Sequence, residues 1–350
     1  MSYCRIIGVG GYTPKRIHND EYIEFFGKRA QHASHFLSHE NRYQTIDLET
    51  GESEISNLQM GYEASIDCLK SANVSPFEVD LIIYTTLTPN NIIPASYTML
   101  QEKLGISSCA GFDIQSGCAG FGTALVTACT FIESGLYNTA LVVGADNLSS
   151  RFGPFMKDKS LISTRMLLNM MMFGDGAGAM LLQSSNHQKN SIYYKMMRSN
   201  RPNESYGSII EVGGSKEPYG SDKIPKENWP VYQNSGISER ILPEILSETL
   251  NEFLKLKNKN ANDIGHYILP VLNKKMLPAF DHLMPDFPVE KAISIEGLGG
   301  AMINSAVPLS FYYGIQTGKI KPGDECVFFA GENTKWQHAV IAGFWSPNIN

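Results

Sequence analysis

Short apolar runs alternate with segments of helical periodicity along most of the chain. The apolar runs have strand length and are bounded by glycine, proline or polar residues. The predicted strands are Ile6–Gly8, Leu81–Leu87, Gly111–Ile114, Ala140–Val143 and Gly178–Leu182, then Ser191–Met196, His266–Leu269, Ala292–Ile295, Cys326–Ala330 and Ala339–Phe344. Apolar spacings of three and four predict helices over Met60–Ser71, Ala95–Leu104, Ala119–Ser134, Ser238–Leu256 and Ala306–Gln316. Strands that alternate with helices predict an α/β architecture with parallel or mixed sheets.

Two stretches lack this periodicity and are predicted to be loops. Ser199–Tyr232 is rich in proline, glycine, asparagine and charged residues, and Gly27–Glu52 is polar. The second stretch contains His32, His35 and His39, which we interpret as surface histidines. Their spacing would line one face of a helix, so a zinc site stays as the remote alternative.

The composition is that of an ordinary globular protein. Of 350 residues, 43% are hydrophobic and 18% charged, and the net charge is −6. No basic run is present, so we expect no nucleic-acid partner. The longest apolar stretches, such as Met166–Phe173, are too short to cross a bilayer, and the N-terminal residues show no signal pattern. We therefore expect a cytoplasmic protein without a membrane partner.

The six cysteines are scattered at positions 4, 68, 109, 118, 129 and 326. They form no C-x-x-C pair and have no nearby histidine, so we expect reduced thiols and no metal site. All except Cys118 fall inside apolar patterns and are predicted to be core residues.

Cys118 lies at a predicted corner between a strand and a helix. The apolar run Cys109–Ile114 ends in small residues, and helical periodicity begins at Phe121. A helix N-terminus favours a thiolate, and the flanking Gly117 and Gly120 would let another molecule approach the sulfur. From the residues alone, a catalytic nucleophile and a buried core cysteine both stay open.

The segment Asp113–Phe121 resembles the nucleophile motif of the β-ketoacyl-acyl-carrier-protein synthase III family, within the thiolase-like superfamily. The resemblance continues over nearly the whole chain. It is carried by Leu81–Pro89, Pro94–Ser96, Gln101–Gly105, Ala140–Asp146, Phe173–Ala179 and Gly318–Asp324. It implies a layered α-β-α-β-α fold with two duplicated halves, residues 1–186 with the nucleophile cysteine and residues 187–350.

In this family the cysteine accepts an acyl group, and a histidine and an asparagine then promote decarboxylation of a malonyl thioester. On the matching positions this chain has Val271 and Ala301. Neither side chain can hydrogen-bond a thioester carbonyl, and a positioned donor of this kind is worth roughly 2.7–4 kcal/mol. Asn304 lies three residues out of register and is not accepted as a replacement. We therefore expect decarboxylative condensation to be lost.

The family's oxyanion hole is also altered. By resemblance, its two donors are the backbone amides of Cys118 and Glu332, the latter replacing a glycine in the loop Ala330–Thr334. We interpret the Glu332 side chain as an exposed loop glutamate. The alternative is a substitute general base whose pKa is raised by burial.

The resemblance also assigns substrate-binding positions. Phe121 and Ile93 match residues that shape the acyl pocket, with Ile93 reaching across a dimer interface, and Arg151 matches an arginine that contacts the coenzyme A nucleotide. The family's N-terminal tryptophan and arginine for that nucleotide have no counterpart. The acyl donor is therefore a coenzyme A thioester or an acyl carrier protein, and no cofactor is expected.

Two functions follow from the resemblance. The first is an acyltransferase that carries an acyl group on Cys118 in fatty-acid, polyketide or specialised-metabolite biosynthesis. The second is a catalytically reduced subunit that pairs with a complete paralogue. The first fits a homodimer and the second a heterodimer.

Overall fold

Two five-stranded mixed sheets form the frame of the protein. The computed structural model describes residues 2–219, 223–270 and 272–348. The first sheet contains, in spatial order, β1 (Tyr3–Tyr12), β7 (Gly176–Ser185), β6 (Thr139–Asp146), β4 (Leu81–Thr85) and β5 (Ala110–Ile114). The second contains β8 (Tyr194–Ser199), β14 (Gln337–Phe344), β13 (Glu325–Gly331), β11 (His266–Ile268) and β12 (Ala292–Ile293).

The two sheets repeat one pairing pattern. In each, the first three strands in this order are antiparallel neighbours and the last three are parallel neighbours. Every strand predicted from an apolar run is present. The predicted α/β class and the duplicated thiolase-like fold are confirmed; the boundary between residues 186 and 187 stays a prediction.

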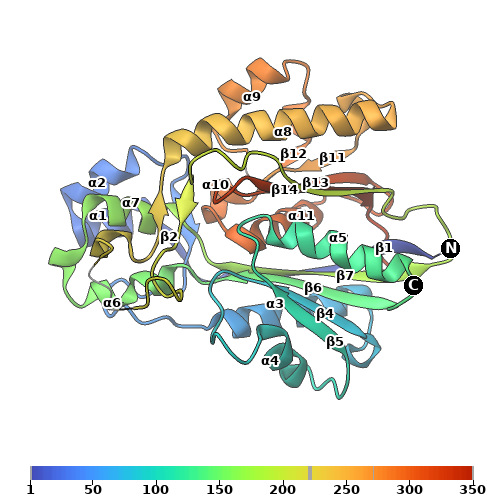
Figure 1. The fold of residues 1–350 in the computed structure, drawn as a ribbon, viewed down its shortest axis with the longest axis horizontal. Helices are drawn as coiled ribbons and strands as arrows, with labels where there is room; N and C mark the ends of the chain where they lie inside the picture. The colour runs from blue at the N-terminus through green and yellow to red at the C-terminus, as the bar shows by residue number, and fades with distance from the viewer. Residues whose placement is uncertain (1, 220–222, 271, 349–350) are drawn as a thin grey trace.

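Helices fill the three layers around the sheets (Figure 1). On the outer face of the first sheet lie α3 (Asn57–Ala72) and α4 (Ser96–Lys103). Between the sheets lie α5 (Gly120–Glu133) and α11 (Ala306–Gln316), which contact strands of both. The outer face of the second sheet carries α8 (Ser235–Lys257), with α9 (Leu277–Leu283) packed against it. These layers are the α-β-α-β-α order expected from the resemblance.

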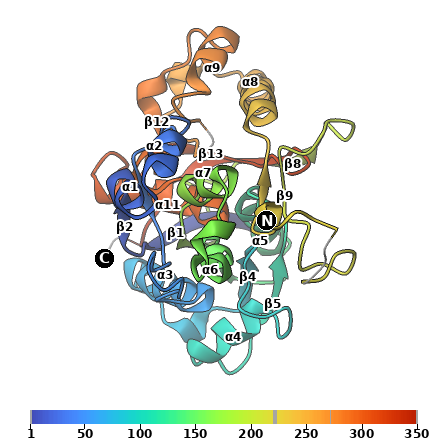
Figure 2. The ribbon, with the colours of Figure 1, turned by 90° about the vertical axis from the view of Figure 1, so that its left-hand side faces the viewer.

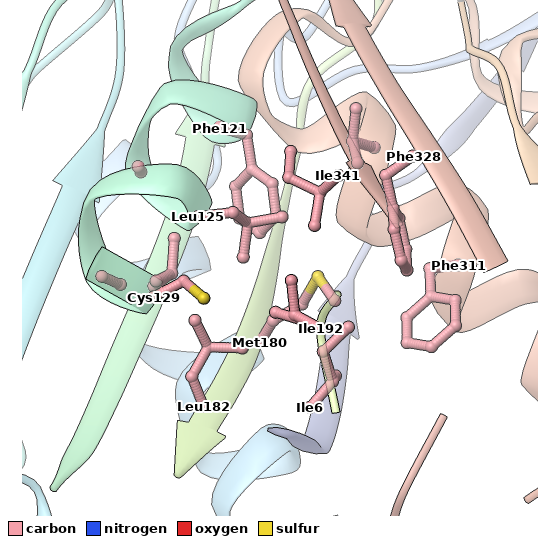
Figure 3. Packing of buried hydrophobic residues seen from close by; sticks show 14 of the residues in the cluster. Ile6, Phe121, Leu125, Cys129, Met180, Leu182, Ile192, Phe311, Phe328 and Ile341 are labelled. Carbon is pink, nitrogen blue, oxygen red and sulfur yellow. The ribbon is translucent and has the colours of Figure 1, made fainter. Parts of the chain in front are cut away.

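The middle layer is an apolar core, shown in Figure 3. From α5, Phe121, Leu125 and Cys129 point toward side chains of both sheets, including Met180 on β7 and Ile341 on β14. Burial of each large side chain is worth about 1.5–3 kcal/mol. The sequence of α5 is apolar on more than one face because the helix is enclosed by both sheets.

A cluster of shorter elements packs at one end of the sheets, facing the viewer in Figure 2. It contains β2 (Arg16–His18), α1 (Asn19–Phe26), α2 (Lys28–Ser34), β3 (Asn41–Tyr43), α6 (Gly153–Met156) and α7 (Thr164–Met172). The prediction that Gly27–Glu52 is a loop was therefore wrong. The helix α2 buries only Ala30 and Ala33, with α7 as its neighbour, so its sequence is mostly polar and carries little periodicity.

The described parts of the segment Ser199–Tyr232, residues 199–219 and 223–232, are largely irregular, as predicted. They contribute the short strand β9 (Ser208–Ile209), which pairs with β10 (Tyr232–Gln233). The remaining short helices are α10 (Glu296–Gly299) and the 3₁₀ turns Pro76–Glu78, Ser149–Phe152, Lys159–Leu161, Lys226–Asn228, Ala261–Asp263, Val289–Lys291 and Ile303–Ser305. Within the described ranges, no helix has both the length and the apolar character needed to cross a membrane.

Candidate active site

Cys118 lies in the turn that joins β5 to α5, as the sequence predicts. Gly117 has a φ of +54°, a conformation that favours glycine. At Gly120, a Cβ atom would lie 2.2 Å from Thr85 Oγ1 and 2.3 Å from Asn304 Oδ1. Both glycines are therefore required by the path of this turn, which leaves Cys118 half-buried.

A cavity of about 140 Å³ lies against Cys118. Its wall is built from segments far apart in the sequence: the stretch between α2 and β3, the end of α7, α8, the stretch before α9, α10, and the connection after β13. Its polar lining includes His39, Asn273, Glu296 and Glu332. A nucleophile, several titratable groups and apolar surface therefore meet in one partly enclosed space.

The Cys118 thiol is not activated in the way we expect from a helix N-terminus. Burial raises its pKa above the usual range, and the negative charges of Glu332 and Asp146 act in the same direction. The thiol is therefore protonated at neutral pH, and its reaction requires a group that accepts the proton.

Glu332 is buried, which contradicts its interpretation as an exposed loop residue. Its carboxylate accepts hydrogen bonds from the backbone amides of Lys335 at 2.9 Å and Gln337 at 2.7 Å, and from the amide and hydroxyl of Thr334. A carboxylate has about four acceptor sites, so these donors use its capacity. The side chain holds the turn after β13 in shape.

The predicted oxyanion hole is incomplete in this arrangement. The backbone amide of Glu332 donates to the carbonyl of Gln337 at 2.9 Å. This amide is therefore not free to stabilise an oxyanion, and the amide of Cys118 is the other predicted donor.

Val271 and Ala301 stand at the positions where the resemblance implies the family's histidine and asparagine. Val271 lies outside the described residues. Ala301 lines the cavity, with its amide bonded to Met172 O and its carbonyl to Gly174 N, both at 3.0 Å. Ala301 thus lines the cavity at the position where the resemblance implies an asparagine in the family.

Asn304 is engaged elsewhere. Its Nδ2 donates to Asp146 Oδ2 at 2.8 Å, and its Oδ1 accepts from Thr85 Oγ1 at 2.8 Å. Burial raises the pKa of Asp146 to about 6, although several donors oppose this shift. Asn304 is fully buried in this network and is not among the residues that line the cavity, which agrees with its rejection as a replacement.

Two titratable residues of the cavity were missed by sequence reasoning. Burial raises the pKa of Glu296 to about 7, opposed by the hydrogen bond from Asn273 Nδ2 to Glu296 Oε1 at 3.3 Å. His39, interpreted as a surface histidine, is buried, and burial lowers its pKa to about 4, with the charge of Arg42 acting in the same direction. Its Nε2 lies 3.3 Å from the carbonyl oxygen of Met171.

Three predicted substrate-binding residues lie away from the cavity. Phe121 is fully buried in the core between the sheets (Figure 3). Ile93 is 83% exposed beside Ile92 at 89%. The guanidinium of Arg151 donates to the carbonyls of Pro230, Val212 and Trp229 and to the hydroxyl of Tyr219. The guanidinium thus stabilises the segment that contains these four residues, and its donors are engaged within the protein.

The histidines of the polar N-terminal stretch do not converge. His32 packs the edge of its ring on Phe36, at 5.2 Å between centroids, whereas His39 faces the cavity. In the part of the chain that the structure describes, no three histidine, cysteine, aspartate or glutamate side chains are arranged to hold a metal ion.

The chain is similar to known proteins of the family that its motifs resemble. The family model of 3-oxoacyl-(acyl-carrier-protein) synthase III matches residues 112–200, which include the turn at Cys118. The β-ketoacyl-acyl-carrier-protein synthase III of Rickettsia bellii is 28% identical over 342 residues, covering 97% of this chain and 99% of the relative. That of Clostridium perfringens (strain 13) is 27% identical over 345 residues, covering 97% and 99%.

The fold is shared with solved structures over their whole length. The 3-oxoacyl-(acyl carrier protein) synthase III of Pseudomonas aeruginosa PAO1 superposes with a TM-score of 0.80 at 20% identity, covering 99% of this chain and 100% of that one. A tetronic acid condensing enzyme superposes with a TM-score of 0.84 at 22% identity, covering 98% and 100%. Over nearly its whole length this chain is similar in sequence to β-ketoacyl-acyl-carrier-protein synthases III, and it shares their thiolase-like fold, as the resemblance predicts.

Proposed function

We propose that the protein is an acyltransferase that carries an acyl group as a thioester on Cys118 and has lost decarboxylative condensation. The observation that carries this proposal is the cavity lined by Cys118 and Ala301, which contains a nucleophile and has an alanine where the resemblance implies an asparagine. Condensation needs donors that stabilise an enolate, and each positioned donor is worth about 2.7–4 kcal/mol. Acyl transfer needs a nucleophile, an oxyanion donor and a site that excludes water.

The reaction has two steps. The Cys118 sulfur attacks the carbonyl carbon of an acyl thioester, a new C–S bond forms, and the old C–S bond breaks as the donor thiol leaves with the proton of Cys118. An acceptor then attacks the acyl-Cys118 carbonyl and releases the cysteine thiol. Since burial and two carboxylates hold the proton on the Cys118 thiol, the first step needs a proton acceptor in the cavity. The second step needs one for the proton of the attacking acceptor, which ends on the released Cys118 thiol.

An acyl carrier protein is favoured over coenzyme A as the donor. The names of the relatives refer to acyl carrier protein. Arg151, the residue expected to contact the coenzyme A nucleotide, is bonded to three backbone carbonyls. The donor would then be recognised through its phosphopantetheine arm, in fatty-acid or polyketide-type biosynthesis.

A catalytically reduced subunit is the second candidate. It is favoured by the amide of Glu332, which is bonded to the carbonyl of Gln337 and is not available as an oxyanion donor. Such a subunit would support a complete paralogue in a heterodimer.

Either function fits a dimer. The edge strand β5 is half-buried, unlike the fully buried β4 beside it, and Ile92 and Ile93 are exposed. We propose that this edge and the two isoleucines meet a partner subunit, in agreement with the interface expected from the family resemblance.

Intact-mass measurement after incubation with acetyl-acyl carrier protein tests the proposal. The expected result is one acetyl group on Cys118 and none on a Cys118→Ala variant. Incubation with malonyl-acyl carrier protein and an acyl primer should release negligible carbon dioxide. Absence of acyl-Cys118 would favour the reduced subunit, whereas rapid release of carbon dioxide would contradict the loss of condensation.

A further inference from the structure

Glu296 is a carboxyl group in the cavity with no role in the two steps of acyl transfer described above. It is the first residue of α10 and lines the same cavity as Cys118. Its one hydrogen-bond donor from a side chain, among the described residues, is Asn273, at 3.3 Å. Unlike Glu332, whose carboxylate is occupied by several donors, Glu296 retains acceptor capacity toward the cavity.

Charged and titratable groups from several elements surround Glu296. The cavity also contains Cys118, His39, Glu239, Lys275 and Glu332. Lys275 bonds the carbonyl of Phe36 and lies 3.9 Å from Glu239. The strand β3, which packs on α10, contributes the buried Arg42, whose Nη2 donates to Asn19 Oδ1 at 2.5 Å. None of these cations forms an ion pair with Glu296 among the described contacts.

We propose that Glu296 is the general base of the second step, and that the acceptor is a protic nucleophile, a hydroxyl, amine or thiol, bound in this cavity. The proposal rests on the acyltransferase function described above. The Glu296 carboxylate takes the proton of the acceptor as the acceptor attacks acyl-Cys118. The C–S bond then breaks, and Glu296 returns the proton to the departing Cys118 thiolate.

The protonation behaviour of the cavity supports this role. Burial raises the pKa of Glu296 to about 7, which is near the optimum for a general base at neutral pH. His39, another candidate base in the wall, has a pKa lowered to about 4 by burial. An acid limb of the transfer rate near pH 7 would therefore report Glu296, and a limb due to His39 would lie near pH 4.

The experiment separates loading from transfer. Cys118 is loaded to completion with p-nitrophenyl acetate, whose leaving group needs no proton from the enzyme. The acetyl-enzyme is freed of reagent and mixed with N-acetylcysteamine between pH 5.5 and 8, and its decay is followed by intact mass. For the wild type we expect a rate that rises through about pH 7 and then levels.

Glu296→Gln is expected to load to the same final stoichiometry and to transfer about 10²-fold more slowly, without the acid limb. Glu290→Gln removes an exposed carboxylate outside the cavity and should behave as the wild type. Asn273→Ala should shift the limb to higher pH, because the hydrogen bond that it removes lowers the pKa of Glu296.

The same experiment distinguishes failure of the acyltransferase proposal from failure of the role of Glu296. If the wild type forms no acetyl-Cys118, the acyltransferase proposal fails. If it forms acetyl-Cys118 but Glu296→Gln keeps the rate and the limb, only the role of Glu296 is overturned. A limb that Asn273→Ala leaves unmoved would likewise count against Glu296 as the titrating group.

Discussion

The side chain of Glu332 packs directly against Gly117, the residue that precedes the candidate nucleophile. A Cβ atom on Gly117 would lie 2.8 Å from Glu332 Oε2 and 3.1 Å from Glu332 Cβ. The turn after β13 therefore supports the turn that carries Cys118. Because the same carboxylate raises the pKa of the Cys118 thiol, one contact links the shape of the site to its protonation.

Gly117→Ala should destabilise the protein more than its backbone conformation alone requires. A non-glycine residue in this region costs roughly 1–2 kcal/mol, and the new methyl group would also displace Glu332. We expect a loss of about 2–4 kcal/mol in urea unfolding, together with slower acylation of Cys118.

Gly135→Ala is the matched control for this prediction. Gly135 has a φ of +78°, and a Cβ atom there would meet nothing within 4 Å. The Gly135→Ala variant should therefore lower the free energy of unfolding only by the cost of the backbone conformation. Equal losses for the two variants would mean that the contact with Glu332 is not tight.

Glu332→Gln should make Cys118 more reactive and the turn less stable. Removing the charge lowers the pKa of Cys118, so iodoacetamide should label it faster at pH 8, as measured by peptide mapping. The amide would place an N–H₂ group against backbone donors, at a cost of about 1–3 kcal/mol. Unchanged labelling, with Glu290→Gln as the reference, would show that the charge of Glu332 does not reach the sulfur.

Glu296 should make the stability of the protein depend on pH. Its pKa in the fold, about 7, lies above the ordinary value of about 4.3. The folded state therefore binds the proton more tightly, and this stabilisation is present below about pH 4 and lost as the pH rises through 7. Glu296→Gln should gain up to about 3 kcal/mol relative to the wild type between pH 4.5 and 8. A difference in unfolding free energy that is constant over this range would contradict the raised pKa.

The strands and layers were predictable because their signals are local. Each of the ten apolar runs is short and bounded by turn residues, and the buried helix α5 continues its apolar spacing from Phe121 to Ile132. The missed helices have weak local signals. In α2 only two alanines are buried, and α7 coincides with the apolar stretch Met166–Phe173, which has no clear helical spacing.

The candidate site was predictable at Cys118 and poorly elsewhere. The side chains of Phe121 and Arg151 are directed by long-range packing, onto the second sheet and onto the segment 199–232, which a motif does not encode. Glu296 did carry a signal. It is a carboxylate in an apolar segment, five residues before Ala301, the position that the resemblance aligns with the missing asparagine. For Glu332, the partners within five residues along the chain indicate a turn-forming role.

Arg151→Ala should affect stability without discriminating between acyl donors. Loss of the guanidinium leaves the carbonyls of Pro230, Val212 and Trp229 without this donor, at a cost of about 1–3 kcal/mol. The ratio of kcat/KM for acetyl-coenzyme A and acetyl-pantetheine should stay constant within twofold. A decrease in kcat/KM for acetyl-coenzyme A alone would instead support the expected contact between Arg151 and the nucleotide.

Arg165→Ala is the control for surface charge near this segment. Its side chain is 55% exposed and lies 3.9 Å from Glu227. An exposed pair of this kind contributes about 0–1 kcal/mol, so the variant should unfold close to the wild type.

Ile93→Asp should weaken dimerisation. Ile92 and Ile93 are 89% and 83% exposed in the single chain, and burial of each side chain in an interface would gain roughly 1.5–3 kcal/mol. An aspartate at this position would instead place a charge in an apolar contact. We expect light scattering to show a dimer for the wild type and a shift toward monomer for the variant.

Leu256→Asp is the control for this prediction. Leu256 is 65% exposed near the end of α8, which covers the second sheet, and its replacement should leave the dimer intact. A monomeric wild type would contradict a homodimer formed through this edge.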